Sequence, residues 1–443
     1  MKTPINDFLQ KYNTSNSVRL HMPGHKGKIC GTEFDITEII GADSLFDANG
    51  IIDESEKNLS SLYNTLFSVY STEGSTLSIK TMLALIYKYA KNSGKNPLVL
   101  ADRKVHCSFL YGVSLLDLQV EWLENERNDL FLSSIDDKII DKKLSQMPIK
   151  PTALYLTSPD YLGNILPIKE IAKVCKNYGV LLVVDNAHGA YLNFLENNIH
   201  PINLGADMCA DSAHKTLPTL TGGAYLHINK NFDYFSKSQV KSMMKTFAST
   251  SPSYLILSSL DSTNKYLFEQ KNDFIKCAKK VEKIKKFCLN LGFNLIGNEP
   301  LKITLDCKSF GYVGKELFSI LKQNNIEIEY ADKDYLVLMF SPLNSDEDLS
   351  KLKDVLSKIE RKKALEKINL NFKIPERKLS IKDALFNAEE KIKVENAKGK
   401  IISSVNINCP PAIPLIFSGE EVDESAIEVM KYYDIEECFV IKE

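Results

Sequence analysis

Short apolar runs alternate with amphipathic stretches through the middle of the chain. Runs rich in Val, Leu, Ile and Ala occur at 97–102, 152–157, 180–185, 207–211 and 223–228. Residues 167–179 lie between two of these runs, carry apolar side chains at helical spacing and end in a glycine, which is typical of an amphipathic helix. Continuous apolar strands separated by helices predict an α/β fold with a mostly parallel sheet covered by helices on both faces.

The pattern changes after the last of these runs. Residues 255–292 read as one or two long helices, and beyond residue 300 the runs "LKITLDC" and "YLVLMFSP" read as strands of a smaller α/β domain. The stretch 380–405 predicts two helices. We therefore divide the chain into an N-terminal segment (1–55), a large ligand-binding domain (56–295) and a small C-terminal domain (296–443).

Composition excludes several classes of function. Of 443 residues, 44% are hydrophobic and 25% are charged, and the formal net charge is −2. This balance gives no electrostatic reason to expect a nucleic acid or an anionic membrane as partner. No apolar run reaches the length of a membrane span, and the start of the chain lacks a signal peptide's apolar core. The nine cysteines and seven histidines show no metal-ligand spacing, so we expect reduced thiols, no metal and a cytoplasmic protein.

Lys215 is an unusual residue for its surroundings. It follows an apolar run in "DSAHK" and precedes a loop rich in Thr, Pro and Gly. Burying an ammonium without a partner is costly, but a lysine can lose its charge by forming a Schiff base with a carbonyl. Ser212 and His214 are spaced to donate hydrogen bonds to an anion beside it. This combination predicts pyridoxal phosphate as the carbonyl partner.

An aspartate at the end of another run supports that prediction. Asp185 ends "LLVVD", where it can keep a pyridine nitrogen protonated and so make the ring an electron sink. His188 follows three residues later and can lie near the ring or the substrate. The alternative for Asp185 is a helix cap.

Two further motifs complete the set. Gly74, Ser75 and Thr76 open a predicted helix, whose free N–H groups and dipole suit a phosphate. His106 follows a strand and is placed to stack on a flat ring. Each alone has a simpler interpretation, as a helix cap or a structural histidine.

The chain resembles the Orn/Lys/Arg decarboxylase group of fold-type I pyridoxal-phosphate enzymes. Besides the residues above, the resemblance rests on "RLHMPGHKG" (19–27), "SPDYLG" (158–163), "STSPSYLILSSLD" (249–261) and "PPAIPLIFSGEEV" (410–422). The chain departs from the group at Glu73-Gly74, where Asn-Gly is expected, and at Ala412, where glycine is usual. It resembles a short form without the large wing domain.

The resemblance implies a role for each site residue. Lys215 would bind the cofactor, Asp185 would hold the pyridine nitrogen and His106 would stack on the ring, while His188 stays near the ring or substrate. The phosphate side would be served by Gly74, Ser75, Thr76, Ser212 and His214. The resemblance also implies a homodimer with shared active sites, in which Ser249 or Thr250 reaches the neighbour's phosphate.

The implied reaction is decarboxylation of a basic amino acid, namely arginine, lysine or ornithine, with arginine preferred by resemblance. An aminotransferase or another lyase of the same fold is an alternative, but it needs an arginine clamp for the carboxylate, and Arg377 is the best of only five arginines. A non-catalytic cofactor-binding regulator is a second alternative. The distal charge of the substrate needs an acid, and the candidates left open are Asp43, Asp47, Glu73, Asp160 and Glu420.

Overall fold

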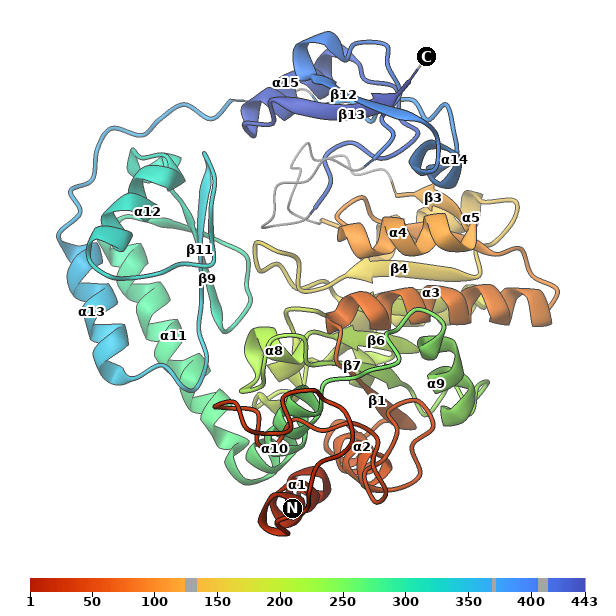
Figure 1. The fold of residues 1–443 in the computed structure, drawn as a ribbon. Helices are drawn as coiled ribbons and strands as arrows, with labels where there is room; N and C mark the ends of the chain where they lie inside the picture. Colours follow the sequence, from red (N-terminus) through yellow and green to blue (C-terminus); the bar gives the residue numbers. More distant parts are fainter. Residues whose placement is uncertain (124–133, 369–371, 405–412, 443) are drawn as a thin grey trace. The chain divides into compact units, whose positions relative to one another are not determined.

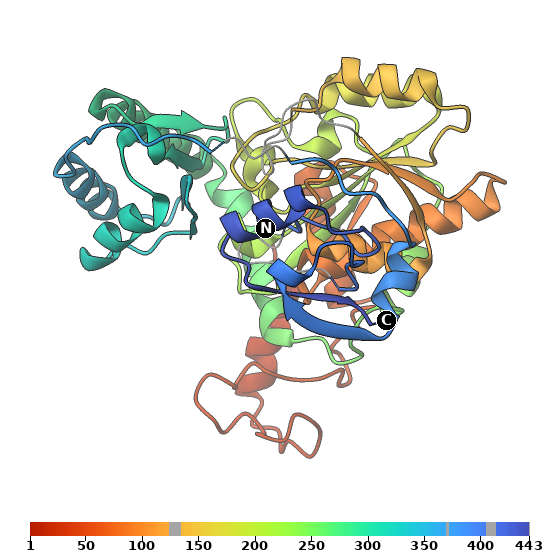
Figure 2. The same ribbon diagram turned by 90° about the horizontal axis from the view of Figure 1, so that it is seen from above.

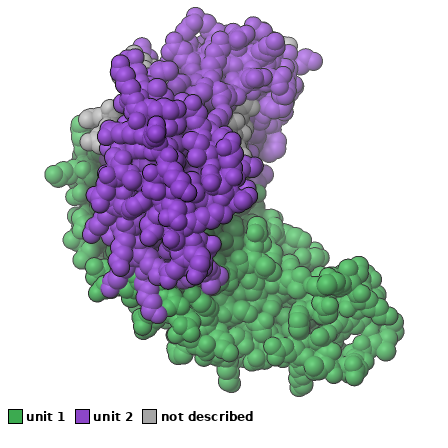
Figure 3. Space-filling model, turned by 90° about the vertical axis from the view of Figure 1, so that its left-hand side faces the viewer, with its two compact units in different colours: residues 1–100, 136–158, 167–275 green, residues 101–135, 159–166, 276–443 purple. Residues whose placement is uncertain are grey.

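The computed structural model describes residues 1–123, 134–368, 372–404 and 413–442. These residues form two compact units, shown in different colours in Figure 3. Unit 1 comprises residues 1–100, 136–158 and 167–275, and unit 2 comprises residues 101–135, 159–166 and 276–443. The division at residue 295 that we predict from the sequence stays a prediction. No helix among the described residues is long and apolar enough to cross a membrane.

The largest sheet among the described residues has seven strands (Figure 1). Its strands are β1 (Phe67–Ser71), β2 (Leu98–Ala101), β3 (Gln119–Trp122), β4 (Ala153–Thr157), β5 (Leu181–Asp185), β6 (Met208–Asp211) and β7 (Ala224–Ile228). The spatial order is β1-β7-β6-β5-β4-β2-β3, with β4, β5 and β6 parallel and β7 antiparallel to both of its neighbours. All five predicted strands and the mostly parallel α/β fold are confirmed.

The helices of unit 1 follow the apolar pattern of the sequence. They are α1 (Pro4–Thr14), α2 (Ile51–Tyr63), α3 (Gly74–Asn92), α5 (Asp137–Gln146), α6 (Ile168–Tyr178), α7 (Pro201–Leu204), α8 (Ala213–Thr216), α9 (Lys237–Lys245) and α10 (Tyr254–Gln270), with the 3₁₀ turn η1 (Ala190–Phe194). Helix α6 buries Ile168, Ile171 and Cys175 and is capped by Gly179, whose φ of +65° places it in the left-handed region that favours glycine. The predicted long helical region is α10 followed by α11 (Asn272–Leu291).

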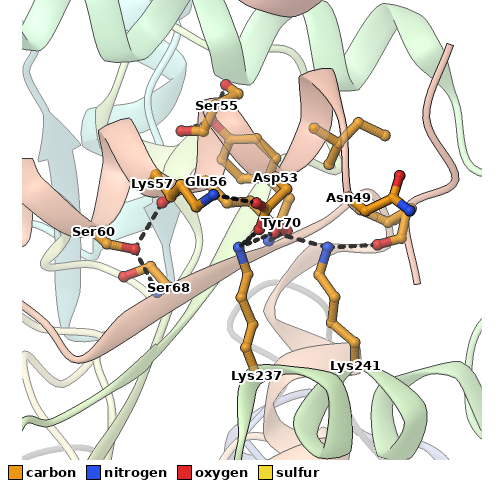
Figure 4. A network of polar contacts seen from close by, with 12 residues as sticks. Asn49, Asp53, Ser55, Glu56, Lys57, Ser60, Ser68, Tyr70, Lys237 and Lys241 are labelled. Carbon is orange, nitrogen blue, oxygen red and sulfur yellow. Dashed lines mark hydrogen bonds and ion pairs between the residues drawn. The ribbon is translucent and has the colours of Figure 1, made fainter. Parts of the chain in front are cut away.

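A buried ion-pair network joins α2 to α9 (Figure 4). Glu56 Oε2 lies 2.8 Å from the ammonium groups of both Lys237 and Lys241, and Lys237 also contacts Asp53 at 2.6 Å. The other oxygen of Glu56 accepts the backbone N–H of Tyr70 at 3.0 Å. Because Glu56 is fully buried, its charge is tolerated only through these partners.

Unit 2 contains a second, antiparallel sheet and several helices. The sheet has the order β10-β11-β9-β8, from β8 (Asn294–Ile296), β9 (Lys302–Asp306), β10 (Tyr330–Ala331) and β11 (Tyr335–Met339). The helices are α4 (Cys107–Leu116), α12 (Gly314–Gln323), α13 (Asp346–Ser357), α14 (Ile381–Leu385) and α15 (Glu424–Tyr432), with the 3₁₀ turns η2 (Lys308–Phe310) and η3 (Val394–Asn396).

One predicted helix is wrong. Within 380–405 the first helix exists as α14, but the second is the strand β12 (Glu389–Lys393), which pairs antiparallel with β13 (Glu437–Ile441). The local sequence "EEKIK" favours a helix by composition. Pairing with a strand more than forty residues later overrides that local preference, because each residue of β12 gains a partner on β13.

Candidate active site

Lys215 lies on the short helix α8, directly after strand β6. Its ammonium nitrogen is 3.0 Å from Nε2 of His188, and His188 is 5% exposed. His188 follows strand β5, the parallel neighbour of β6, so the two side chains come from adjacent strand ends. The structure therefore brings Lys215 and His188 together, as the carboxyl ends of neighbouring parallel strands should.

Asp185 is the last residue of β5 and is 1% exposed. Its carboxylate accepts hydrogen bonds from the hydroxyl of Tyr155 at 3.3 Å and from the backbone N–H of Ala187 at 3.1 Å. Burial raises the pKa of Asp185 to about 6, although these hydrogen bonds and the positive charge of Lys215 act in the opposite direction. The carboxylate is thus placed to gain from a further cationic partner.

The predicted phosphate residues begin helix α3 beside the lysine loop. The hydroxyl of Ser212 donates to that of Ser75 at 2.7 Å, and the backbone N–H of Gly74 donates to the carbonyl of Gly222 at 2.8 Å. Gly74 has a φ of +67°, and a Cβ added there would meet nothing within 4 Å. Ser75 and Ser212 therefore meet, while Thr76 follows them in the first turn of α3.

His214 contacts the backbone of its own loop. Its Nδ1 lies 3.0 Å from the carbonyl oxygen of Gly223, and because a carbonyl only accepts, Nδ1 must donate. Burial lowers the pKa of His214, which favours the neutral ring. A neutral ring with its proton on Nδ1 accepts at Nε2, so this geometry does not favour His214 as a phosphate donor.

His106 belongs to unit 2, where it is the N-cap of α4. Its Nδ1 accepts the backbone N–H of Ser108 at 3.2 Å and lies 2.7 Å from the hydroxyl of the same residue. The ring orientation is thus fixed by the helix start. Its stacking on a cofactor stays a prediction.

Three of the five candidate acids for the substrate's distal charge have structural roles. Asp43 accepts the backbone N–H groups of Ser44 and Asn49 and, at the start of α2, those of Gly50, Ile52 and Asp53, all at 2.8 to 3.3 Å. Asp160 is 1% exposed and accepts the N–H of Asn164 at 2.9 Å. Glu420 binds Arg103 through both oxygens, at 2.5 and 3.0 Å.

The other two acids are exposed. Asp47 pairs with Lys245 at 2.8 Å on the surface of unit 1. Glu73 precedes Gly74, and its Oε1 accepts the backbone N–H of Ser249 at 2.8 Å. Ser249 therefore lies beside the phosphate residues of its own chain, and its predicted role toward a neighbour's phosphate stays a prediction.

The best candidate for a carboxylate clamp is also engaged elsewhere. Nη1 of Arg377 donates to the carbonyl of Val120 at 3.2 Å, and the backbone of Arg377 bridges to Glu420. Arg103 is held by Glu420 and lies over the ring of Phe417, with its guanidinium carbon 3.9 Å from the ring centre. Arg127 lies outside the described residues. These contacts weaken the aminotransferase alternative.

Sequence reasoning missed Tyr155 and Asp211. Tyr155 comes from β4, whose pairing with β5 sets Thr157 opposite Asp185, and nothing in the sequence links these strands. Asp211 precedes Ser212, but its buried contacts depend on histidines from two other segments. A carboxylate at the end of an apolar run was the only available signal for Asp211.

The site has an acceptor that suits a protonated pyridine nitrogen, the carboxylate of Asp185, and hydroxyl and N–H donors that suit a phosphate at the start of α3. The buried hydroxyl of Thr157, opposite Asp185 in the β4–β5 register, has no hydrogen-bond partner in the described part of the chain. An unpartnered buried hydroxyl beside a buried acid fits a polar ligand at this position. The residues present are therefore compatible with pyridoxal phosphate.

Two models of one protein family match the sequence of this chain. Residues 3–294 match the family model of the Orn/Lys/Arg decarboxylase major domain, and residues 370–441 match that of the Orn/Lys/Arg decarboxylase C-terminal domain. The first match alone covers more than half of the chain.

Individual relatives extend over nearly the whole chain. The uncharacterized protein YaaO of Bacillus subtilis is 28% identical over 97% of this chain and 93% of its own length. An arginine decarboxylase of the same organism is 25% identical over 96% of this chain and 92% of its own length.

Solved structures show the same fold at low identity. The lysine decarboxylase LdcF of Francisella novicida superposes with a TM-score of 0.81 at 16% identity, covering 99% of this chain and 81% of its own. The constitutive lysine decarboxylase of E. coli gives a TM-score of 0.78 at 17% identity, covering 100% and 82%. At this identity the likeness establishes the fold alone.

Proposed function

The chain belongs to the Orn/Lys/Arg decarboxylase family, and we propose that it removes the α-carboxylate of a basic amino acid with pyridoxal phosphate as cofactor. The observation that carries this proposal is the meeting of Lys215 with His188 at 3.0 Å, next to the buried carboxylate of Asp185. A lysine, a histidine and a buried acid at adjacent strand ends are the groups this chemistry needs.

Most of the candidate site residues have a task in the proposed reaction. When bound, pyridoxal phosphate supplies an electron sink for the electron pair that remains after the carboxylate leaves. Lys215 would hold the cofactor through its carbonyl group, and Asp185 would hold the ring nitrogen in its protonated form. The first turn of α3, with Gly74, Ser75 and Thr76, and the hydroxyl of Ser212 bind the phosphate. We assign to His106 the stacking on the face of the cofactor ring.

His188 is placed for proton transfer near Lys215. Its Nε2 contacts the ammonium group directly, so the histidine can accept a proton from Lys215 and return it. Because His188 is almost fully buried, such exchange would be shielded from bulk water. The same shielding favours loss of a carboxylate as neutral CO₂.

The substrate is arginine, lysine or ornithine, and we give arginine the first place. Support comes from relatives of similar length that are named arginine decarboxylase, such as those of Bacillus subtilis and Bacillus anthracis, at 25% and 26% identity. The structures similar in fold are lysine decarboxylases, which keeps lysine as a substrate to be tested.

A product assay by mass spectrometry tests the proposal. Purified protein with pyridoxal phosphate is offered each of the three amino acids separately, without a keto-acid acceptor. We expect a product lighter by one CO₂ from one of them and no product from the Lys215→Ala variant. Formation of a keto acid only after an acceptor is added would instead identify an aminotransferase, and turnover by Lys215→Ala would contradict the role of the lysine.

We also propose a homodimer in the cytoplasm. The segment before α2 loops out from the rest of unit 1 (Figure 2) and exposes several large apolar side chains, which are Val18, Leu20, Met22, Ile29 and Ile40 at 62% to 103% exposure. Such a concentration of exposed apolar groups indicates an interaction surface. Light scattering that gives a monomer with full activity would contradict the dimer.

The eight described cysteines are free, which is in keeping with the proposed reducing compartment.

A further inference from the structure

A buried polar cluster lies next to the proposed active site and takes no part in the chemistry described above. Its centre is Asp211, the last residue of β6, which is fully buried. Three side-chain nitrogens lie within hydrogen-bond distance of the carboxylate oxygens. They are Nε2 of His200 at 2.9 Å, Nε2 of His227 at 3.2 Å and the amide nitrogen of Asn186, which donates at 2.8 Å. The thiol of Cys209 adds a weaker contact at 3.5 Å.

The contacts of His200 favour a hydrogen-bonded anion site over a metal site. His200, Cys209 and Asp211 have ligand atoms close enough to hold a metal ion. However, Nδ1 of His200 accepts the backbone N–H of Ile202 at 3.3 Å, so the remaining ring proton of a neutral His200 sits on Nε2 and points at Asp211. A metal would need the lone pair of that same nitrogen.

The second histidine continues the cluster toward β1. Nδ1 of His227 lies 2.7 Å from the hydroxyl of Ser68, which in turn lies 2.8 Å from the hydroxyl of Thr65. Burial alone would raise the pKa of Asp211, but the two histidines outweigh it and hold that pKa well below its ordinary value. Asp211 therefore keeps a negative charge inside unit 1.

Asp211 is linked to both ends of the active site. Toward Asp185, the link is Asn186, whose side chain donates to Asp211 and whose backbone N–H donates to the carbonyl of Ala210 at 2.9 Å. Toward Lys215, the link is the chain itself, because Asp211 is followed by Ser212 and then by α8. The negative charge of Asp211 also raises the pKa of Asp185.

We propose that Asp211 is a positioning residue for the cofactor: its buried charge, held by His200 and His227, favours the protonated form of the cofactor bound at Lys215, and its hydrogen bond to Asn186 fixes the turn after Asp185. This inference rests on the proposed function only in that the cofactor binds at Lys215. Asp211 acts through charge and through Asn186, and it needs no contact with substrate.

The test is a pH titration of the visible absorbance of the purified protein with bound pyridoxal phosphate. Asp211→Asn preserves the shape of the side chain and removes the charge, so the midpoint should fall by on the order of one pH unit. The matched control is Asp207→Asn. Asp207 starts the same stretch of chain, is half-buried and accepts the N–H of Leu182 at 2.7 Å, but it lies at the opposite end of β6.

The outcomes separate this inference from the proposed function. A lowered midpoint in Asp211→Asn with an unchanged midpoint in Asp207→Asn supports the role of Asp211. Equal midpoints in the wild type and both variants overturn it, whether or not the protein decarboxylates a substrate. A wild-type protein with no cofactor absorbance overturns the proposed function as well.

A second variant covers the case in which Asp211→Asn does not fold. In the double variant Asp211→Asn/His227→Gln the charge is again absent, and the glutamine can turn its amide oxygen toward the asparagine amide where the histidine offers only an N–H. The midpoint should therefore fall by as much as expected for Asp211→Asn alone. Circular dichroism confirms folding. An unchanged midpoint in the folded double variant overturns the proposal.

Discussion

Arg103 and Glu420 form a bidentate ion pair inside unit 2, although their positions in the sequence differ by 317. The carboxylate also accepts the backbone N–H of Phe417 at 2.8 Å, and the guanidinium lies over the ring of the same residue. Glu420 is 2% exposed. The pair therefore fixes the segment that carries the C-terminal family motif, and it leaves Glu420 engaged with Arg103 rather than with a substrate.

Glu420→Gln should destabilise unit 2 strongly. The change leaves the buried Arg103 without a counter-charge, which typically costs about 3 to 5 kcal/mol. Trp122 is the single tryptophan of the chain and its ring lies 4.7 Å from that of Phe417, so its fluorescence reports unfolding at this place. The control is Glu421→Gln, a half-exposed neighbour paired with Lys378 at 3.3 Å, which should cost less than about 1 kcal/mol. Equal denaturation midpoints for the two variants would contradict the prediction.

Glu56→Gln should destabilise unit 1 by a similar mechanism. Lys241 is almost fully buried and would lose its ion pair with Glu56, and Lys237 would lose one of its two acidic partners. We expect a loss of about 3 kcal/mol in the free energy of unfolding. Lys57→Gln removes only the exposed pair with Asp53 and should cost about 0.5 kcal/mol. Urea denaturation followed by circular dichroism compares them, and a loss below about 1 kcal/mol in Glu56→Gln would refute the network's importance.

Asp185→Asn should stabilise the cofactor-free protein above pH 6. Burial raises the pKa of Asp185 from 3.8 to about 6 in the folded chain. Between pH 3.8 and pH 6 the folded chain therefore keeps a proton on Asp185 that the unfolded chain has largely lost. The stability contributed by this proton is present below about pH 4 and is lost as the pH rises through 6. The variant lacks this loss, so its advantage over the wild type should grow to about 3 kcal/mol by pH 7.5. Urea midpoints at pH 5 and 7.5 test the slope, and an advantage that does not grow would count against it.

Tyr155→Phe should weaken binding of pyridoxal phosphate. The Tyr155 hydroxyl donates to Asp185 at 3.3 Å, and its loss removes one of the interactions that favour the ionised carboxylate. A hydrogen bond of this kind is worth about 1 kcal/mol, so the cofactor Kd should rise about fivefold. Tyr70→Phe is the control, because Tyr70 is equally buried but bonds to Ser55 at 2.7 Å. Absorbance titrations of the cofactor-free variants should show the rise only in Tyr155→Phe.

Local pattern was sufficient for much of the fold. The five apolar runs are strands because a buried parallel strand needs apolar side chains on both faces, and that requirement is visible in each run separately. The order of the strands was not predicted, since β7 lies between β1 and β6 through pairings that no short stretch encodes. The same limit explains the error at 389–393, where pairing with β13 outweighs helix-forming composition.

Some residues of the candidate site are recognisable from local sequence, and others are identified only by the structure. Lys215, Asp185 and Ser75 follow recognisable local patterns, and the structure brings the loop of Lys215 to Ser75 through Ser212. Tyr155 and Asp211 gain their roles only from the packing of neighbouring strands. Sequence alone therefore identifies groups that bind a ligand directly more readily than those that act through another residue.

The sequence offers five candidates for the acid that recognises the distal charge of the substrate, and the structure reduces the choice. Asp43 caps α2, Asp160 closes a turn and Glu420 binds Arg103. Of the two exposed acids, Asp47 is held by Lys245, whereas Glu73 stands at the start of α3 beside the phosphate residues. A carboxylate next to a phosphate is repelled by it, and a cationic substrate group between the two would relieve this repulsion.

Glu73→Gln should therefore raise the KM for the basic amino acid about threefold to fivefold, as expected for one exposed ionic contact, with little change in kcat. The glutamine keeps an acceptor for the N–H of Ser249, so the loop should stay in place. The cofactor Kd should not rise, because the variant removes a negative charge near the phosphate. Asp47→Asn is the matched control and should leave KM unchanged. Steady-state kinetics of both variants decide the matter: an unaltered KM in Glu73→Gln, or an equal rise in Asp47→Asn, would remove Glu73 as the recognition residue.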